Sequence, residues 1–301
     1  MMAPYEDRLD ELYTVHRLFD ASQAEAIEAA LPSIRAVVTG GGTGLSNAWM
    51  EKLPALGVIA VNGVGTDRID LKFARSRGID VAITAGVLTD DVADLGIALL
   101  LDLLRHVAKG DAYVRAGKWG KEAFPLGTAP KGKRVGILGL GQIGKAFGRR
   151  AEAFGMQVSY WNRSAVTDVT WAAAASPMAL AEDCDILVVC IAASVATQNI
   201  VNAEMLKALG PKGFVVNIAR GAVIDEDALL AALHDGTIAG AGLDVFVNEP
   251  DIREDFFTAP NTVLMPHQAS ATIETRMAMG DLVLANVAAH IAGEKPPTTI
   301  N

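Results

Sequence analysis

Short apolar runs alternate along the chain with segments whose apolar residues recur at helical spacing. Runs at residues 34–39, 58–62 and 81–84 predict strands, as do later runs at residues 135–138, 156–161, 185–191, 214–218, 241–246 and 262–265. Helices are predicted at residues 6–13, 22–30, 69–77, 90–107, 142–154, 226–234 and 271–292. The run at 185–191 is apolar after its first residue, which is typical of a strand covered on both faces. Strands and helices in alternation therefore predict an α/β protein with doubly wound parallel sheets.

The ends of several elements carry specific signals. Ser22, followed three residues later by Glu25, predicts the N-cap of the helix at 22–30. Thr89 is the expected N-cap of the helix at 90–107, which has two acidic residues in its first turn. Residues 14–19 are strand-like, and residues 109–133 lack apolar periodicity. We expect an ordered connector at 109–133, because long structureless loops are uncommon in compact domains.

Length and charge narrow the range of functions. A chain of 301 residues, 51% of them hydrophobic, is expected to form two domains. The net charge of −9 and the lack of a basic block argue against a nucleic-acid partner. No apolar run reaches the ~18 residues of a membrane span, and the acidic N-terminus lacks the apolar core of a signal peptide. Cys184 and Cys190 have neither disulfide nor metal spacing, so we expect reduced core thiols in a cytoplasmic protein without a metal.

A glycine-rich turn follows the strand predicted at 135–138. Gly139, Gly141 and Gly144 form a Gly-x-Gly-x-x-Gly pattern that leads into the helix at 142–154. In a dinucleotide site the first glycine permits the turn, the second lets the pyrophosphate approach, and the third lets helix and strand pack closely. The spacing alone is a weak signal in a chain with 29 glycines, and a plain glycine turn is the alternative. The strand–turn–helix context and the following strand favour a nucleotide site.

The end of the second strand indicates which nicotinamide cofactor fits. An NAD enzyme places Asp or Glu about 20 residues past the glycines to bind the ribose 2′-hydroxyl. Here Asn162 stands 18 residues after Gly144, and Arg163 and Ser164 follow it. Asn162 lacks the charge that would repel a 2′-phosphate, and Arg163 offers a forked cationic donor. The tripeptide predicts that NADPH is preferred over NADH; the alternative is a solvated turn.

Three ionisable residues follow predicted strands and stand beside glycine or proline: Arg220, Glu249 and His267. Ligands of doubly wound sheets bind outside the carboxyl ends of the strands, where all three are expected to lie. Each also has an ordinary interpretation, as a surface charge, a solvated turn residue or a structural histidine. Together they are candidates for a catalytic site.

Five ordered motifs point to a known family. They are Gly63-Val64-Gly65-x-Asp67, Gly139-x-Gly141-x-x-Gly144, Asn217-x-x-Arg220-Gly221, Gly242-Leu243-Asp244-Val245-Phe246 leading to Glu249-Pro250, and Pro266-His267-x-Ala269-Ser270. From about residue 58 to the last helix, the sequence resembles the D-isomer-specific 2-hydroxyacid dehydrogenases. Within this family it is most similar to the glyoxylate/hydroxypyruvate reductase and hydroxyphenylpyruvate reductase branch.

The resemblance implies a fold and a reaction. The implied fold has a Rossmann cofactor domain at 90–268 and a flavodoxin-like substrate lobe at 1–89 and 269–301, with the active site in the cleft between them. The implied reaction is NADPH-dependent reduction of small 2-keto acids, such as glyoxylate and hydroxypyruvate, to D-2-hydroxy acids. His267 would donate the proton and Glu249 would pair with its ring, which suits an imidazole that titrates near neutral pH. Arg220 would bind the substrate carboxylate and polarise the carbonyl.

Further site residues are implied in the same way. Backbone amides of Val64 and Gly65 would hold the substrate carboxylate, and Asp244 would contact the nicotinamide end. The implied cofactor contacts are Gly139, Leu140, Gly141, Gln142, Ile143, Gly144, Asn162, Arg163, Ser164, Ile191, Ala192, Thr197, Ile218, Ala219, Asp244 and Ala269. The helix at 90–107 and the connector around Trp119 resemble the segments through which this family forms homodimers. The resemblance implies that Trp119 reaches the partner's substrate pocket; the alternative is that it only packs the connector.

The chain also departs from the family, and other functions stay open. Where the family usually has a proline after residue 191, this chain has Ala192, so the shape of one cofactor loop is expected to differ. The family's first strand comes earlier than any strand here, so we expect an edge strand to be missing. A nucleotide-sensing protein on this fold can retain the same three residues, and a reductase of bulkier keto acids such as phenylpyruvates is a further alternative. Formate dehydrogenases pair their histidine with glutamine, so Glu249 argues against that branch.

Overall fold

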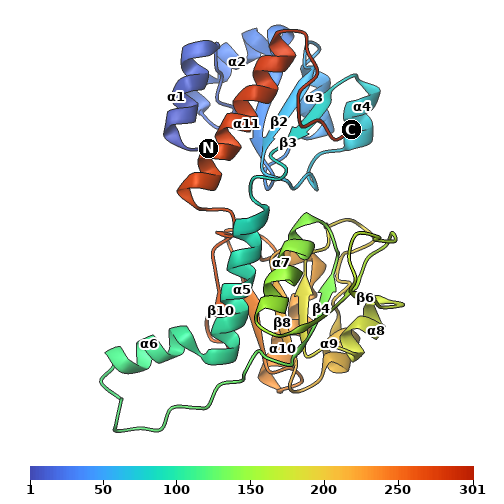
Figure 1. Ribbon diagram of the computed structural model, residues 1–301. Helices are drawn as coiled ribbons and strands as arrows, with labels where there is room; N and C mark the ends of the chain where they lie inside the picture. Colours follow the sequence, from blue (N-terminus) through green and yellow to red (C-terminus); the bar gives the residue numbers. More distant parts are fainter. The chain divides into compact units, whose positions relative to one another are not determined.

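The computed structural model describes residues 1–301, and the chain divides into two compact units (Figure 1). The first unit combines Met1–Leu88 with Ser270–Asn301, and the second is Thr89–Ala269. Each unit contains a parallel sheet with helices on both faces, so the prediction of an α/β protein with two parallel sheets is confirmed. None of the helices has the length and apolar character needed to cross a membrane.

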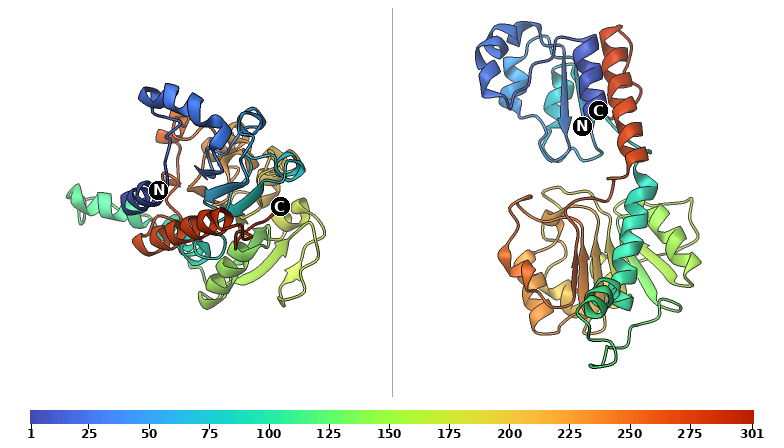
Figure 2. Two further views of the ribbon diagram at one scale, coloured as in Figure 1. Left: turned by 90° about the horizontal axis from the view of Figure 1, so that it is seen from above. Right: turned by 90° about the vertical axis from the view of Figure 1, so that its left-hand side faces the viewer.

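The first unit is built on a three-stranded sheet. Its strands are β1 (Ala36–Gly40), β2 (Val58–Asn62) and β3 (Asp80–Ile83), in the order β1-β2-β3. Ile59 and Val61 of β2 point to one face, where they pack with residues from α3 (Asn47–Lys52) and α4 (Leu71–Ser76). Ala60 points to the opposite face and packs under α11 (Ile273–Ile291), beside which α1 (Ala3–Leu12) lies (Figure 2). The two-residue alternation of β2 thus covers both faces of the sheet.

The strand expected at residues 14–19 is wrong, because these residues bond to the neighbouring helices instead of a sheet. The backbone N–H of Arg17 donates to the side chain of Gln23, and its guanidinium lies 2.7 Å from a carboxylate oxygen of Asp10. The N-cap expected at Ser22 is also wrong. Asp20 accepts from the Ser22 N–H and caps the short 3₁₀ turn η1 (Ala21–Gln23), after which α2 (Ala24–Ala30) begins; a second turn, η2 (Leu31–Ser33), follows.

The second unit is built on a seven-stranded parallel sheet in the order β10-β9-β8-β7-β4-β5-β6. The strands are β4 (Arg134–Leu138), β5 (Gln157–Trp161), β6 (Ala172–Ala173), β7 (Ile186–Val189), β8 (Phe214–Asn217), β9 (Gly240–Leu243) and β10 (Thr262–Leu264). α5 (Thr89–Arg105) and α7 (Gln142–Ala153) lie side by side on one face (Figure 1). The other face buries the core shared with α8 (Pro177–Glu182), α9 (Ala203–Leu209) and α10 (Glu226–His234). Two 3₁₀ turns, η3 (Gly221–Val223) and η4 (Glu254–Phe257), complete the unit.

The strand order reverses at β4, which pairs with β5 on one side and β7 on the other. From β4 the chain passes first to β5 and β6, and it later returns to β7 and continues outward to β10. In doubly wound sheets such a reversal opens a crevice at the carboxyl ends of the strands, where ligands bind. In this unit the reversal lies at the ends of β4 and β7.

The helix predicted at 90–107 differs at both ends from α5, the helix in the structure. Thr89 is its first residue, not its cap, and the hydroxyl of Thr89 donates to Gln142. At the other end, His106 has the left-handed φ of 56° and breaks the helix after Arg105. A second helix, α6 (Val107–Arg115), then occupies the start of the predicted connector, and the side chain of Asp102 accepts from the N–H of Ala108 at 2.9 Å.

Candidate active site

The three fingerprint glycines have distinct surroundings. A Cβ at Gly139, whose φ is +97°, would lie 2.6 Å from the backbone of Ile191 in the loop after β7. A Cβ at Gly144 would lie 2.5 Å from the carbonyl oxygen of Gly139. A Cβ at Gly141 would meet no atom within 4 Å. The first and third glycines are therefore required by packing, whereas the second faces open space.

The helix that follows this turn suits an anion. α7 begins after Gly141 and has no side-chain cap, so the amide groups of its first turn, at Gln142, Ile143 and Gly144, are available to a ligand. The positive end of the helix dipole adds to this attraction. With Leu140 buried below the turn, the residues present fit the pyrophosphate of a dinucleotide.

Asn162 joins the glycine turn to the end of β5. Its Oδ1 accepts from the backbone N–H of Leu140 at 3.2 Å, and its Nδ2 donates to the carbonyl of Ser164 at 2.9 Å. Both ends of the amide are thus occupied by backbone groups. Arg163 and Ser164 are exposed on the turn that Asn162 holds. The turn therefore presents a cation and a hydroxyl to solvent.

The loop after β7 folds on itself without the proline that the family usually has there. Thr197 donates through its hydroxyl to the carbonyl of Ala192 at 2.8 Å, and its N–H donates to the carbonyl of Ser194 at 3.0 Å. Because Ile191 lies against Gly139, this loop borders the glycine turn. The predicted cofactor residues of the two loops are therefore brought together at the ends of β4 and β7.

The loop that carries Arg220 is shaped by the last residue of β8. Asn217 is 1% exposed; its Oδ1 accepts from the N–H of Ala219 at 3.0 Å, and its Nδ2 donates to the carbonyl of Arg220 at 3.0 Å. Arg220 itself donates from Nη1 to the carbonyl of Ala219 at 2.7 Å. Ile218 is buried beneath the loop, beside Gly96 of α5. The position of Arg220 is thus set by the buried amide of Asn217.

A glycine lets this loop contact the next one. A Cβ at Gly221 would lie 2.0 Å from the carbonyl carbon of Phe246 and 2.3 Å from the N atom of Val247. Any other residue at position 221 would push the two loops apart. Arg220 therefore stands next to the segment that leads from β9 to Glu249.

Glu249 and His267 form the hydrogen-bonded pair predicted from the sequence. Oε2 of Glu249 lies 2.6 Å from Nδ1 of His267, and Oε1 accepts from the N–H of Phe246 at 2.8 Å. Burial raises the pKa of Glu249, but the hydrogen bonds from His267 and Phe246, with the charges of His267 and Arg220, lower this pKa overall. The carboxylate of Glu249 thus stays ionised where it faces the imidazole.

Asp244 holds the turn that carries His267. His267 has a left-handed φ of 54°, a conformation that a non-glycine residue adopts only when its surroundings support it. The two oxygens of Asp244 accept from the next two amides, Gln268 at 2.7 Å and Ala269 at 3.0 Å. Asp244 is 1% exposed, and burial raises its pKa. Both carboxylate oxygens are thus engaged by backbone; the nicotinamide contact implied for Asp244 stays a prediction.

The structure brings together the three candidate catalytic residues within the second unit. Arg220, Glu249 and His267 follow the neighbouring strands β8, β9 and β10. Val64 and Gly65 follow β2 in the first unit, where the loop of Gly41 lies against Gly65. Their contact with substrate stays a prediction.

Sequence reasoning missed the residues that support this arrangement. Asn217 and Gly221 lie in the same motif as Arg220, but the motif alone does not indicate what they do. Glu226, on α10, accepts at 2.8 Å from the N–H of Val247 and appeared in the sequence only as the start of a helix. A polar residue at the end of an apolar strand is the signal that could have indicated Asn217; no sequence signal connects Glu226 with residue 247.

Known proteins match this chain over nearly its full length. A family model described as D-isomer specific 2-hydroxyacid dehydrogenase, NAD binding domain, matches residues 97–269, more than half of the chain. The 2-ketogluconate reductase of Gluconobacter oxydans is 48% identical over 285 residues, which cover 95% of this chain and 91% of that protein.

Two crystal structures are similar as well. A dehydrogenase from Rhizobium meliloti is 61% identical with a TM-score of 0.80, covering 100% of this chain and 98% of that one. An NADPH-dependent glyoxylate/hydroxypyruvate reductase from Sinorhizobium meliloti, in complex with NADP and malonate, is 38% identical with a TM-score of 0.91, covering 100% of this chain and 94% of the other. The chain therefore belongs to the D-isomer-specific 2-hydroxyacid dehydrogenase family and is an NAD(P)-dependent oxidoreductase.

Proposed function

We propose that this protein reduces small 2-keto acids to D-2-hydroxy acids with NADPH as the hydride donor, and that glyoxylate and hydroxypyruvate are the favoured substrates. The observation that carries the proposal is the 2.6 Å contact between Glu249 and His267, with the charge of Arg220 close enough to lower the pKa of Glu249. The similar reductase from Sinorhizobium meliloti, named for glyoxylate and hydroxypyruvate, supports the choice of substrate.

The roles of the three side chains follow from their chemistry. When bound, the reduced nicotinamide supplies a hydride to the carbonyl carbon of the keto acid. His267 transfers a proton from Nε2 to the carbonyl oxygen, because its Nδ1 faces Glu249. Glu249 holds the ring in place and stabilises the imidazolium before transfer. Arg220 binds the substrate carboxylate with its planar fork and draws electron density from the carbonyl.

The turn after β5 supports NADPH as the cofactor. Asn162 contributes no carboxylate to repel a 2′-phosphate, and its amide holds the turn on which Arg163 and Ser164 are exposed. The guanidinium of Arg163 and the hydroxyl of Ser164 would bind the 2′-phosphate. A homologous structure that contains NADP is consistent with this assignment.

A second candidate is the reduction of a longer 2-keto sugar acid. It is favoured by the 48% identical relative named 2-ketogluconate reductase, which covers 95% of this chain. The same three side chains would act on the keto acid end in either case. The two candidates differ only in the part of the substrate beyond the reacting carbon.

Initial rates with NADPH over a panel of keto acids test both candidates. The panel contains glyoxylate, hydroxypyruvate, 2-ketogluconate and phenylpyruvate. The proposal expects the highest kcat/KM for glyoxylate or hydroxypyruvate; a higher value for 2-ketogluconate would select the second candidate. NADPH binding without turnover of any of the four acids would contradict both and indicate a nucleotide-sensing protein.

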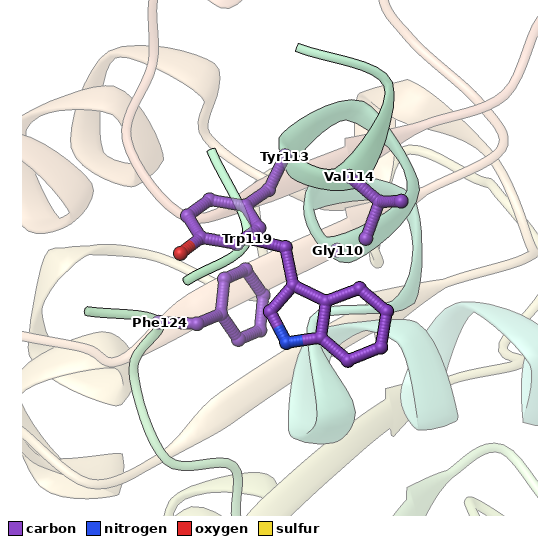
Figure 3. A pocket seen from close by; sticks show the side chains of 5 residues that line it. All are labelled: Gly110, Tyr113, Val114, Trp119 and Phe124. Carbon is purple, nitrogen blue, oxygen red and sulfur yellow. The ribbon is translucent and has the colours of Figure 1, made fainter. Parts of the chain in front are cut away.

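A homodimer forms part of this proposal, and its contact surface would be the segment around α6. Figure 1 shows α6 and the following residues extending away from the sheet of their unit. Trp119 is 79% exposed and Leu126 is 95% exposed. Figure 3 shows an apolar hollow between α6 and its connector, lined by Gly110, Tyr113, Val114, Trp119 and Phe124. A second copy of the chain is the proposed occupant, because exposed aromatic residues beside such a hollow are typical of association surfaces.

Light scattering at micromolar concentration tests the dimer. We expect the mass of a dimer for the unchanged protein and a shift towards monomer for Trp119→Lys. Phe257→Lys is the matched control, since Phe257 is 68% exposed elsewhere in the same unit and should leave the mass unchanged. A monomeric mass for the unchanged protein would contradict the proposal.

A further inference from the structure

Glu226 contacts the loop that carries Glu249, although Glu226 and this loop are distant in the sequence. It is the first residue of α10, and the cap of that helix is Asp225, whose side chain accepts from the N–H of Ala228 at 3.1 Å. Glu226 is therefore not needed to cap the helix. Its Oε1 instead accepts from the backbone N–H of Val247 at 2.8 Å.

The two carboxylates hold consecutive amides of one loop. Glu249 accepts from the N–H of Phe246 at 2.8 Å, and Glu226 accepts from the next N–H, that of Val247, at 2.8 Å. Gly221 packs against the peptide between these two amides. One end of the loop is thus clamped between the Arg220 loop and α10, and the other end carries Glu249 to His267.

The pKa of Glu226 is raised overall, and burial is the main cause. Burial raises the pKa of Glu226, as do the charges of Asp227 and Glu249; the hydrogen bond from Val247 and the charge of Arg253 lower it. Arg253 also pairs with Asp227 and Asp255, at 2.8 Å from the latter. Glu226 contributes a hydrogen-bond acceptor at the distance that the N–H of Val247 requires.

We propose that Glu226 is a positioning residue: by accepting from Val247 it fixes the loop that places Glu249 against His267. The proposal rests on the proposed role of His267 as proton donor. Without this acceptor, the Val247 amide loses its partner and the loop relaxes. Glu249 then holds the imidazolium less well. As a result kcat decreases, and the loss of activity at alkaline pH begins at a lower pH.

Two conservative variants separate the effect of the length of the Glu226 side chain from the effect of its charge. Glu226→Gln keeps an oxygen at the same reach and removes the charge, whereas Glu226→Asp keeps the charge and withdraws the oxygen by one methylene. We expect Glu226→Gln to retain kcat within about twofold. We expect Glu226→Asp to lower kcat about tenfold, the lower range for a hydrogen bond to a charged group, with the KM for NADPH unchanged. Asp227→Asn is the matched control, because Asp227 pairs with Arg253 but not with the loop.

The decisive readout is the NMR titration of the His267 imidazole, assigned with His267→Gln, alongside kcat and its pH profile. We expect the titration midpoint to move to lower pH in Glu226→Asp and to stay in place in Glu226→Gln and Asp227→Asn. The proposal is overturned if Glu226→Asp leaves kcat and the midpoint unchanged, or if Glu226→Gln loses as much as Glu226→Asp. Full kcat in a His267→Ala enzyme would instead reject the proposed proton donor, and the titration would still report on Glu226.

Discussion

Oε2 of Glu249 lies 2.6 Å from Nδ1 of His267, although 18 residues separate the two in the chain. The contact arises because β9 and β10 are parallel neighbours, so the loops at their carboxyl ends start side by side. Glu249 is anchored by the amide of Phe246, and the turn of His267 is anchored by Asp244. The pair is therefore fixed by backbone contacts from both sides before substrate binds.

Replacing Glu249 by glutamine should change the pH dependence of reduction. The pKa of Glu249 is lowered, so its carboxylate is charged at neutral pH and faces Nδ1 of the His267 ring. Reduction needs a proton on this ring, so kcat/KM falls as pH rises. In Glu249→Gln the fall should occur about one to two pH units lower, the equivalent of one charged hydrogen bond. A profile of kcat/KM between pH 5 and 9 measures this; coincident profiles would contradict the pairing.

Replacing Gly141 by alanine should weaken cofactor binding but not the fold. Gly141 has an ordinary extended backbone, with φ −82° and ψ −163°, and a Cβ there would meet no protein atom within 4 Å. We expect a similar Tm and a Kd for NADPH raised about tenfold, which corresponds to about 1.4 kcal/mol. Gly144→Ala is the contrasting variant, since its Cβ would lie 2.5 Å from a carbonyl oxygen, and it should lose about 1–3 kcal/mol of stability. An unchanged Kd in Gly141→Ala would mean that the cofactor does not approach this turn.

The double variant Asn162→Asp, Arg163→Ala should shift the preference towards NADH. It adds a carboxylate that repels the 2′-phosphate and removes the cation that attracts it. The introduced carboxylate would still accept from Leu140, but the donor that Asn162 supplies to Ser164 would be lost. The ratio of kcat/KM for NADPH to that for NADH should fall about ten- to a hundredfold. Equal kcat/KM for the two cofactors in the unchanged protein would contradict the assignment of Arg163.

Acid should destabilise the first unit through His290. Its ring packs on Gly57, where a Cβ would lie 2.2 Å from Cε1, and burial and then the charge of Arg35 lower its pKa from 6.5, against the opposing charge of Asp80. Below pH ~6.5 the unfolded chain therefore binds this proton more readily than the folded one, so stability present above that pH is lost as pH falls.

Thermal unfolding between pH 7.5 and 5.5 checks this contribution. We expect the decrease in Tm on acidification to be smaller in His290→Gln than in the unchanged protein. His234→Gln is the control, because His234 is exposed on α10 and should leave the decrease as it is. The same decrease in all three proteins would show that His290 does not contribute.

The buried strands of the fold could be predicted because their residues are almost all apolar. The four residues of β7 are all apolar and buried, as a strand between two helix layers requires. The break at His106 could not be predicted, because a left-handed residue leaves no periodic signal in the sequence. The cap at Ser22 failed because Asp20 caps the turn two residues earlier and accepts from both the N–H and the hydroxyl of Ser22.

In the candidate site, too, some residues could be predicted from the sequence and others could not. Arg220, Glu249 and His267 could be found because they stand directly after strands, beside glycine or proline, in motifs typical of a family. The support that Asp244 gives to His267, and Glu226 to Val247, arises from side chains that meet backbone amides of distant segments. Such contacts depend on the packed loops and are not encoded in local spacing.

The central claim is that His267 donates the proton, and the kcat of His267→Ala tests it most directly. With NADPH and hydroxypyruvate or glyoxylate at neutral pH, we expect this kcat to be about 10²- to 10⁴-fold below that of the unchanged protein, the usual contribution of general acid–base catalysis. His234→Ala, which alters an exposed histidine, should keep full activity. A His267→Ala enzyme with near-normal kcat would contradict the account.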